Sequence, residues 1–285
     1  MNKKWLFGLI PAAVITLGTV WIAWENTALS SREIVVSDGR LPKSFSGFRI
    51  ALVSDLHDAE FGAGNKKLLA LLQEGSPDLI AITGDLVDSS RSDIDAVVNF
   101  AAAASEIAPT AYVTGNHEVR LPENSLQRLL KGLEKVGVQV LRGESFEISR
   151  NGEKIRIAGA DDLGFFARDC SVAEAKLRFA ETIDFSSGAY TVLLSHRPDL
   201  PEIYDSSGAA VILCGHVHGG QFRIPLLGGV YAPGQGLFPK YDSGLYELEN
   251  SFMVVSRGLG NSAFPFRINN RPEVIFVKLE RQEEK

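Results

Sequence analysis

The feature that most restricts the fold of this chain is a repeated pattern in which an apolar run ends at a short polar motif. All five histidines of the 285-residue chain lie in these motifs. The motifs, in chain order, are Asp55-Leu56-His57, Gly84-Asp85, Gly115-Asn116-His117-Glu118, Ser195-His196 and Gly215-His216-Val217-His218. Apolar runs of this length are typical of strands buried on both faces. The pattern predicts an α/β fold in which the ends of buried strands carry the motifs.

The order of the expected elements indicates how the strands pair. After an edge strand over 32–36, the first half alternates strands over 48–53, 78–83, 110–114 and 137–141 with helices over 65–74, 93–105 and 125–136. Asn65 is the expected N-cap of the first of these helices. This alternation implies right-handed crossovers and parallel pairing. The second half is richer in strands, expected over 146–148, 154–158, 189–194, 209–214, 244–248, 252–256 and 273–279. We therefore predict two mixed sheets with helices outside them.

The motifs are expected to meet, because open α/β sheets bind ligands beyond the carboxyl ends of their strands. Imidazole, carboxylate and amide groups without a thiolate suit Mn, Zn, Fe or Mg, and the sequence does not choose among them. Asp85 has two carboxylate oxygens and could bridge two ions. Two ions about 3.5–4 Å apart hold a hydroxide and clamp a phosphoryl group. His117, oriented by Glu118 or Asp88, is the expected proton donor to the leaving oxygen.

Composition excludes one class of partner and leaves the cysteines without a special role. A net charge of −6 and a pI near 5.5 argue against nonspecific nucleic-acid binding, which needs a basic surface. Cys170 and Cys214 are far apart in sequence. Cys214 closes an apolar run, and we expect it to be a small buried side chain rather than a disulfide partner or a metal ligand.

The N-terminus differs from the rest of the chain. Lys3 and Lys4 precede an uncharged stretch from Trp5 to Trp24, which is long enough to cross a bilayer core as a helix. We expect a single-pass transmembrane anchor, with cleavage of a signal peptide near Ala28 as the alternative. The lysines favour a cytoplasmic N-terminus and a catalytic domain outside the cytoplasm. The expected division is an anchor or signal over 1–28, a tether and edge strand over 29–47, and a catalytic domain over 48–285.

The motif series Asp-x-His, Gly-Asp-x-x-Asp, Gly-Asn-His-[Asp/Glu], His and Gly-His-x-His resembles the calcineurin-like metallophosphoesterase superfamily over roughly residues 48–278. The resemblance implies a four-layer α/β/β/α sandwich of two mixed sheets with two divalent metal ions, of which Mn is favoured. One ion would be bound by Asp55, His57, Asp85 and His218. The other would be bound by Asp85, Asn116, His196 and His216. His117 would be the general acid, and Asp88 completes the second motif.

A narrower resemblance is to the membrane-associated YkuE/YaeI-like branch of this superfamily. It rests on the sequences over 215–225, 241–246 and 256–260. Val217 stands where that branch usually has Thr, at a position between two ligands. The branch is related to a UDP-diacylglucosamine pyrophosphate hydrolase, which adds a nucleotide-linked glycolipid to the substrates to be considered.

Three functions remain open. The first is a dinuclear metal-dependent phosphodiesterase that acts at the membrane or cell envelope through a metal-bridging hydroxide, on a phosphoester that is a lipid or an envelope component. The second is a glycolipid pyrophosphate hydrolase of lipid A synthesis, whose cytoplasmic substrate conflicts with the expected topology. The third is a non-catalytic, metal-stabilised interaction module, which typically loses ligands that this chain retains. The sequence indicates no protein partner.

The region after the last motif is rich in phenylalanine and arginine, and it has two interpretations. The residues are Phe222, Phe238, Phe264 and Phe266, with Arg223, Arg257, Arg267 and Arg271 among them. They could form a cleft for an amphiphile, with arginine on phosphate and phenylalanine on an acyl chain. Alternatively, the phenylalanines lie in the core and the arginines on a solvated face, which we favour for most of them.

Overall fold

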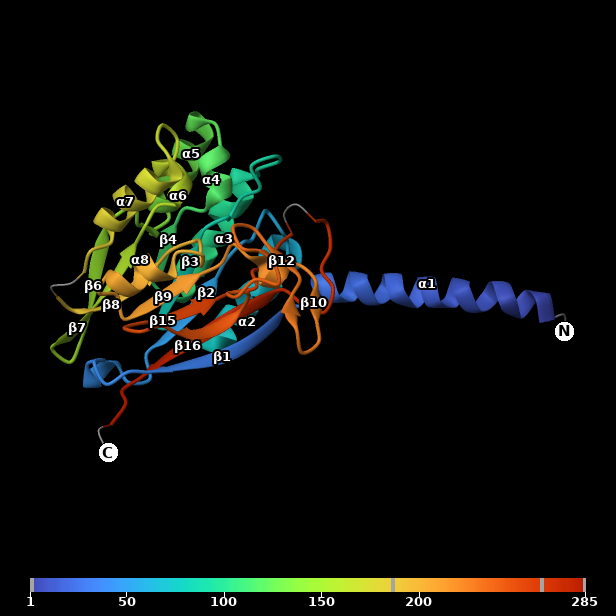
Figure 1. Ribbon diagram of the computed structural model, residues 1–285, viewed down its shortest axis with the longest axis horizontal. Helices are drawn as coiled ribbons and strands as arrows, with labels where there is room; N and C mark the ends of the chain where they lie inside the picture. The colour runs from blue at the N-terminus through green and yellow to red at the C-terminus, as the bar shows by residue number, and fades with distance from the viewer. Residues whose placement is uncertain (1–2, 186–187, 262–263, 284–285) are drawn as a thin grey trace.

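Two six-stranded mixed sheets form the centre of the protein (Figure 1). The structure is a computed structural model that describes residues 3–185, 188–261 and 264–283, with side chains from residue 13 onward. The first sheet has the order β1 (Ser30–Ser37), β16 (Glu273–Glu280), β2 (Arg49–Val53), β3 (Leu79–Thr83), β4 (Thr110–Val113) and β5 (Gln139–Val140). The second has the order β14 (Gly244–Glu247), β15 (Phe252–Val255), β9 (Val211–Cys214), β8 (Tyr190–Leu194), β7 (Glu153–Gly159) and β6 (Ser145–Arg150).

Each sheet is parallel at its centre, as the alternation of strands and helices predicts. Strands β2, β3, β4 and β5 run parallel, and so do β7, β8, β9 and β15. The antiparallel pairs are β16 with β2, β14 with β15, and β6 with β7. Every residue of β3 and β9 is buried, which explains why their sequences are continuous apolar runs rather than alternating ones.

Three apolar clusters stack the sheets and helices into four layers. One lies between the first sheet and helices α2 (Lys66–Gly75), α3 (Ile94–Ile107) and α5 (Glu123–Lys135). A second fills the space between the two sheets. The third lies between the second sheet and helices α7 (Val172–Thr182) and α8 (Pro201–Ser206). This arrangement confirms the predicted α/β fold with two mixed sheets.

Short elements that were not predicted from the sequence complete the fold. They are the helices α4 (Asn116–Arg120) and α6 (Leu163–Phe166), the 3₁₀ turns η1 (Lys43–Phe45), η2 (Ala63–Asn65) and η3 (His218–Gly220), and two small hairpins, β10 (Arg223–Ile224) with β11 (Gly228–Gly229) and β12 (Tyr231–Ala232) with β13 (Gly236–Leu237). Asn65 is the N-cap residue of α2, as predicted, but its side chain makes no capping hydrogen bond to the helix. Its Oδ1 instead accepts a hydrogen bond from the backbone N–H of Phe61.

Helix α1 (Lys3–Thr27) projects from one end of the molecule, with the hairpins near its root (Figure 1). Within the part of the chain whose side chains are described, no helix is both long enough and apolar enough to cross a membrane. The transmembrane helix expected from the sequence is therefore not confirmed. The side chains of Lys3, Lys4, Trp5 and Pro11, which contributed to that expectation, lie outside the described ones.

Candidate metal centre

The predicted site residues come from both sheets and meet at the carboxyl ends of the parallel strands. Four follow β2, β3 and β4 of the first sheet, and His117 lies in α4 directly after β4; three histidines follow β8 and β9 of the second sheet. The residues are Asp55, His57, Asp85, Asn116, His117, His196, His216 and His218, and all are buried. The parallel strands thus bring together segments more than 160 positions apart in sequence.

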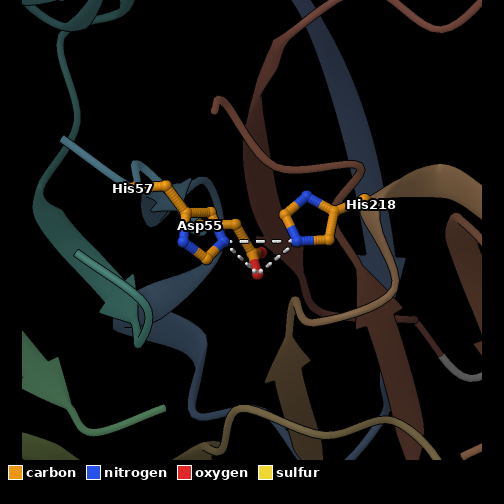
Figure 2. Close-up of side chains that lie close together, drawn as sticks. All are labelled: Asp55, His57 and His218. Atoms are coloured by element: carbon orange, nitrogen blue, oxygen red, sulfur yellow. Dashed lines mark hydrogen bonds and ion pairs between the residues drawn. The ribbon is translucent and has the colours of Figure 1, made fainter. Parts of the chain in front are cut away.

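The first cluster consists of Asp55, His57 and His218, whose polar atoms point toward one another (Figure 2). The Nε2 atoms of His57 and His218 are 3.3 Å apart. The Oδ1 atom of Asp55 lies 4.0 Å from the first of these nitrogens and 3.7 Å from the second. Two imidazole nitrogens and a carboxylate oxygen converging at these distances form a donor set for a divalent cation.

The second cluster consists of Asp85, His196 and His216, with Asn116 beside them. His196 Nε2 lies 3.3 Å from Asp85 Oδ2 and 3.1 Å from His216 Nδ1. The amide oxygen of Asn116 is also 3.1 Å from His196 Nε2. Here too imidazole, carboxylate and amide donors face a common point, without a thiolate.

Asp85 joins the two clusters through a single oxygen. Its Oδ2 is 3.6 Å from His57 Nε2 and 3.3 Å from His196 Nε2. Its other oxygen, Oδ1, accepts a hydrogen bond of 2.8 Å from the backbone N–H of His117. The carboxylate is therefore fixed in orientation, with one oxygen facing both groups of donors.

The backbone at these positions is unusual. Asp55, His57, Asp85, His216 and His218 all have positive φ, between 47° and 71°. Non-glycine residues adopt this region at a cost, and such residues gather at functional sites. The tight turns also need Gly215, because a Cβ there would collide with Ser54 and with the Asp55 carboxylate. The local chain is thus shaped to aim side chains at one point rather than to minimise backbone strain.

Hydrogen bonds fix which ring nitrogen of His196 faces the cluster. Nδ1 of His196 lies 2.8 Å from the carbonyl oxygen of Thr83, which accepts its hydrogen. In the neutral ring Nε2 then carries the lone pair, and it faces Asp85. A carbonyl that orients the far nitrogen is the usual support of a metal-binding histidine.

Burial and the charges of neighbouring carboxylates shift the pKa values of the site residues. Burial raises the pKa of Asp55 to about 6, and the charge of Asp85 adds to this increase. Burial would lower the pKa of His196, but the Asp85 carboxylate outweighs it and raises that pKa to about 10. Burial lowers the pKa of His57 to about 4. The two buried carboxylates and the neutral imidazole of His57 form an environment that a cation stabilises, and a bound cation would take the place of the proton that Asp85 keeps on His196.

His117 is oriented by Ser89, which the sequence analysis did not single out. The backbone N–H of Ser89 donates to Nδ1 of His117 at 3.0 Å, so in the neutral ring the proton sits on Nε2. Asp88 is also close, with its Oδ1 3.7 Å from Nδ1. The ring of His117 meets that of His57 edge-on, with centroids 4.5 Å apart. His117 therefore lies against the first cluster with Nε2 as the proton-bearing atom.

Glu118 has a different role from the one expected. Its buried carboxylate accepts hydrogen bonds from the backbone N–H groups of Asp85, Leu86 and Gly115, at 2.9, 2.9 and 2.7 Å. It thus holds the loop after β3 against the start of α4. Of the two orienting residues expected for His117, Asp88 is the one that the structure places beside the ring.

The phenylalanines and arginines that follow the last histidine motif do not all fit one interpretation, either a cleft for an amphiphile or a core with a solvated face. Phe238, Phe264 and Phe266 are exposed, so the expectation that most of the phenylalanines lie in the core is wrong for these three. Arg267 is fully buried rather than solvated. Its guanidinium donates to the carbonyl oxygens of Arg257 and Gly260, and its Nη2 lies 3.2 Å from His218 Nδ1. Cys214 is buried and free, as predicted.

A cleft of about 170 Å³ opens at the two clusters. The donor residues Asp85, Asn116, His117, His216 and His218 line it, together with Arg120. Its lining also includes Val217, Gln221, Tyr231, Pro233 and Phe264. The donor groups are thus accessible to a small polar group whose attached chain would meet apolar and aromatic side chains.

Comparison with known proteins identifies the family. The family model of the calcineurin-like phosphoesterases matches residues 48–220, more than half of the chain. The chain belongs to this family. It is a metal-dependent phosphoester hydrolase by this membership, and the clustered donor groups agree with it.

Three relatives show the breadth of the similarity. The chain is 27% identical to the uncharacterized metallophosphoesterase YkuE of Bacillus subtilis over 284 residues, 97% of this chain and 95% of that protein. It is 29% identical to phosphodiesterase YaeI of Escherichia coli, over 81% of this chain and 82% of that protein. It is 25% identical to a zebrafish (Danio rerio) transmembrane protein with metallophosphoesterase domain, over 98% of this chain and 63% of that protein. These matches support the YkuE/YaeI-like branch.

Proposed function

We propose that this protein is a phosphodiesterase whose two clusters hold two divalent cations, with Mn²⁺ favoured. The observation that carries the proposal is the position of Asp85 Oδ2, which faces His57 and His196 at once. The first ion would be held by Asp55, His57, Asp85 and His218. The second would be held by Asp85, Asn116, His196 and His216. When bound, the cations would activate water as the nucleophile and neutralise the phosphoryl oxygens.

The chain's own groups then supply orientation and a proton. Asp85 is fixed by the backbone N–H of His117, so its shared oxygen needs no reorganisation. Protonated on both ring nitrogens, His117 would donate its Nε2 proton to the leaving alcohol oxygen and become a neutral imidazole. Arg120 lines the same cleft, where its positive charge would attract the anionic substrate.

We also propose that the protein acts at a membrane or envelope surface. The support is the uncharged sequence from Trp5 to Trp24 and the similarity to proteins named as transmembrane proteins with a metallophosphoesterase domain. A phosphodiester of a lipid or of an envelope component is the substrate class that such a location favours.

Hydrolysis of bis-p-nitrophenyl phosphate by the full chain with Mn²⁺ tests the catalytic part. We expect metal-dependent turnover that Asn116→Ala greatly reduces. The matched control is Asn250→Ala, because Asn250 hydrogen-bonds to the carboxylate of Asp205, away from the clusters. Well-folded, metal-loaded protein without turnover would contradict a general phosphodiesterase. Cleavage of UDP-diacylglucosamine alone, to the lipid monophosphate and UMP, would instead identify the glycolipid pyrophosphate hydrolase.

A further inference from the structure

Exposed apolar side chains gather at one end of the molecule. Among the described residues, 14 of the 17 large apolar side chains that are exposed lie either on α1 or in the segment 224–266. The segment contributes Leu226, Leu227, Leu237, Phe238, Phe264 and Phe266, which we call the apolar rim. Leu226 is fully exposed, and Leu227 and Leu237 are 67% and 69% exposed. An apolar patch of this kind on a soluble domain marks an interaction surface.

Hydrogen bonds and ring contacts hold the parts of this surface together at the root of α1. The backbone N–H and carbonyl of Arg267 bond the side chain of Asn26 at the end of α1, at 2.8 and 3.1 Å. Phe222 contacts the rings of Phe264 and Phe266, with centroids 5.5 Å apart in both pairs. In Figure 1 the hairpins β10–β11 and β12–β13 lie beside the end of the projecting helix that meets the domain.

The backbone at the rim holds apolar residues outward at a cost. Leu226 and Phe238 have φ of 71° and 51°, a region that favours glycine or asparagine. Polar turn residues would relieve this strain without exposing apolar surface. The rim therefore carries leucine and phenylalanine at positions where the fold itself does not require them.

The metal cleft opens beside the rim. Phe264 belongs to both, since it is exposed and also lines the cleft together with the donor groups. Lys240 borders a second pocket together with Leu226 and Leu227. Apolar turns flanked by a lysine suit the boundary between lipid headgroups and acyl chains. A substrate embedded in that boundary would present its phosphate to the cleft.

We propose that the apolar rim docks on a phospholipid surface and that the cleft takes the phosphodiester headgroup of a lipid held in it. The rim consists of separate protruding turns rather than a flat face, and α1 extends from the same end with six exposed large apolar side chains from residue 13 onward, where its side chains are described. An extended apolar phase covers both at once, whereas a folded partner would need to match both shapes. The docking part stands on these exposures alone, and the substrate part rests on the proposed function.

Tryptophan quenching tests the docking directly. The full chain carrying Leu226→Trp is mixed with phosphatidylethanolamine–phosphatidylglycerol vesicles with and without brominated acyl chains. The wild type gives the background of its native tryptophans. We expect the added tryptophan to lose at least half of its emission, because bromine quenches only nearby rings. Leu177→Trp is the control, since Leu177 is 68% exposed on α7, outside both apolar regions. Equal quenching in the two variants would overturn the proposal.

Activity on matched esters tests the substrate class. Phosphatidyl-p-nitrophenol in vesicles and bis-p-nitrophenyl phosphate in water share a leaving group and differ in the lipid. We expect Leu226→Asp with Leu227→Asp to reduce turnover of the lipid ester at least tenfold and leave the soluble ester unchanged. The control, Val172→Asp with Leu177→Asp, should change neither.

The outcomes separate the two proposals. If the soluble ester is hydrolysed and the two double variants hydrolyse the lipid ester at equal rates, docking on a lipid surface is contradicted and the proposed phosphodiesterase activity still holds. If the wild type hydrolyses neither ester, the proposed phosphodiesterase activity is contradicted. The quenching experiment then tests the docking on lipid by itself. Analytical ultracentrifugation without lipid tests the remaining occupant. If the wild type has the mass of two copies and the Leu226→Asp, Leu227→Asp variant has the mass of one, the rim binds a second copy of the chain and the lipid proposal is overturned.

Discussion

At the scale of single residues, the two clusters depend on a few atoms whose roles differ in how visible they are in a sequence. Asp85 is visible because a carboxylate after a buried strand and a glycine is a recognisable pattern. Ser89 is not, because it acts through a backbone N–H that any residue except proline supplies. Arg267 is equally hidden, since its sequence neighbourhood does not reveal that its guanidinium is fully buried against His218.

Replacing Asp85 by Asn should remove the shared anionic oxygen while keeping the shape of the side chain. Changes to groups outside a ligand set typically cost about 10–100-fold in affinity or activity, so we expect a loss of more than about 100-fold in turnover with less bound metal. Atomic emission on the purified protein and turnover of bis-p-nitrophenyl phosphate measure these. Asp205→Asn, a carboxylate bonded to Asn250 and Ser251 away from the clusters, is the control. Normal metal content and turnover in Asp85→Asn would contradict the two-ion assignment.

Replacing His117 by Ala should slow esters in proportion to how much their leaving group needs a proton. We expect a loss of about 10²–10⁴-fold on diphenyl phosphate and a much smaller loss on bis-p-nitrophenyl phosphate. Burial lowers the pKa of His117 below its ordinary value of 6.5. The protonated fraction of His117 falls as pH rises through that pKa. In the wild type, the rate on diphenyl phosphate divided by the rate on bis-p-nitrophenyl phosphate should therefore fall with increasing pH, with a midpoint below 6.5. A ratio with the same pH profile in wild type and His117→Ala would exclude the acid role.

At the scale of elements, the long and strongly patterned segments could be predicted and the short ones could not. The strands over 79–83 and 110–113 are buried on both faces, so their apolar runs are unmistakable. Helix α4 has five residues and begins at Asn116, and each strand of the small hairpins has two residues, so none of them is long enough to show a periodic pattern. Helix α7 buries only Ala175 and Phe179, which leaves its apolar stripe too narrow to stand out.

Replacing Asn26 by Ala should loosen the root of α1 without unfolding the domain. Its side chain makes two hydrogen bonds to the backbone of Arg267, and their net loss costs about 1–2 kcal/mol locally. We expect hydrogen exchange at the Arg267 amide to become roughly tenfold faster, since 1.4 kcal/mol corresponds to that factor. Thr27→Ala is the control, because Thr27 bonds only the carbonyls of α1 itself. Equal protection at Arg267 in both variants would show that the contact does not hold this junction.

At the scale of the whole molecule, the site ties the two sheets together. Asp55, His57 and Asp85 come from the first sheet, and His196, His216 and His218 come from the second. Asp55 and Asp85, whose charges repel each other, follow the neighbouring strands β2 and β3 of the first sheet. A ligand that binds these groups in the folded state alone stabilises the entire sandwich rather than one loop.

Chelation should therefore lower the unfolding temperature of the full chain. At a free Mn²⁺ concentration about 100 times its dissociation constant, binding adds about 2.7 kcal/mol. For a domain of this size that corresponds to a rise of about 5–10 °C. Calorimetry with Mn²⁺ and with a chelator measures the difference, and Asp85→Asn should show a smaller one. An identical unfolding temperature under both conditions would contradict binding at the shared site.

The place of β16 has a consequence for how the protein is made. This strand is formed by Glu273–Glu280, near the end of the chain, yet it lies between β1 and β2, which are among the first elements synthesised. A growing chain on the ribosome therefore cannot complete its first sheet until translation is almost finished. Until then β1 has no partner and one side of β2 is an open edge, which invites pairing with other chains. A premature stop before Glu273 would remove an inner strand, so the shortened product should aggregate rather than persist as a smaller enzyme.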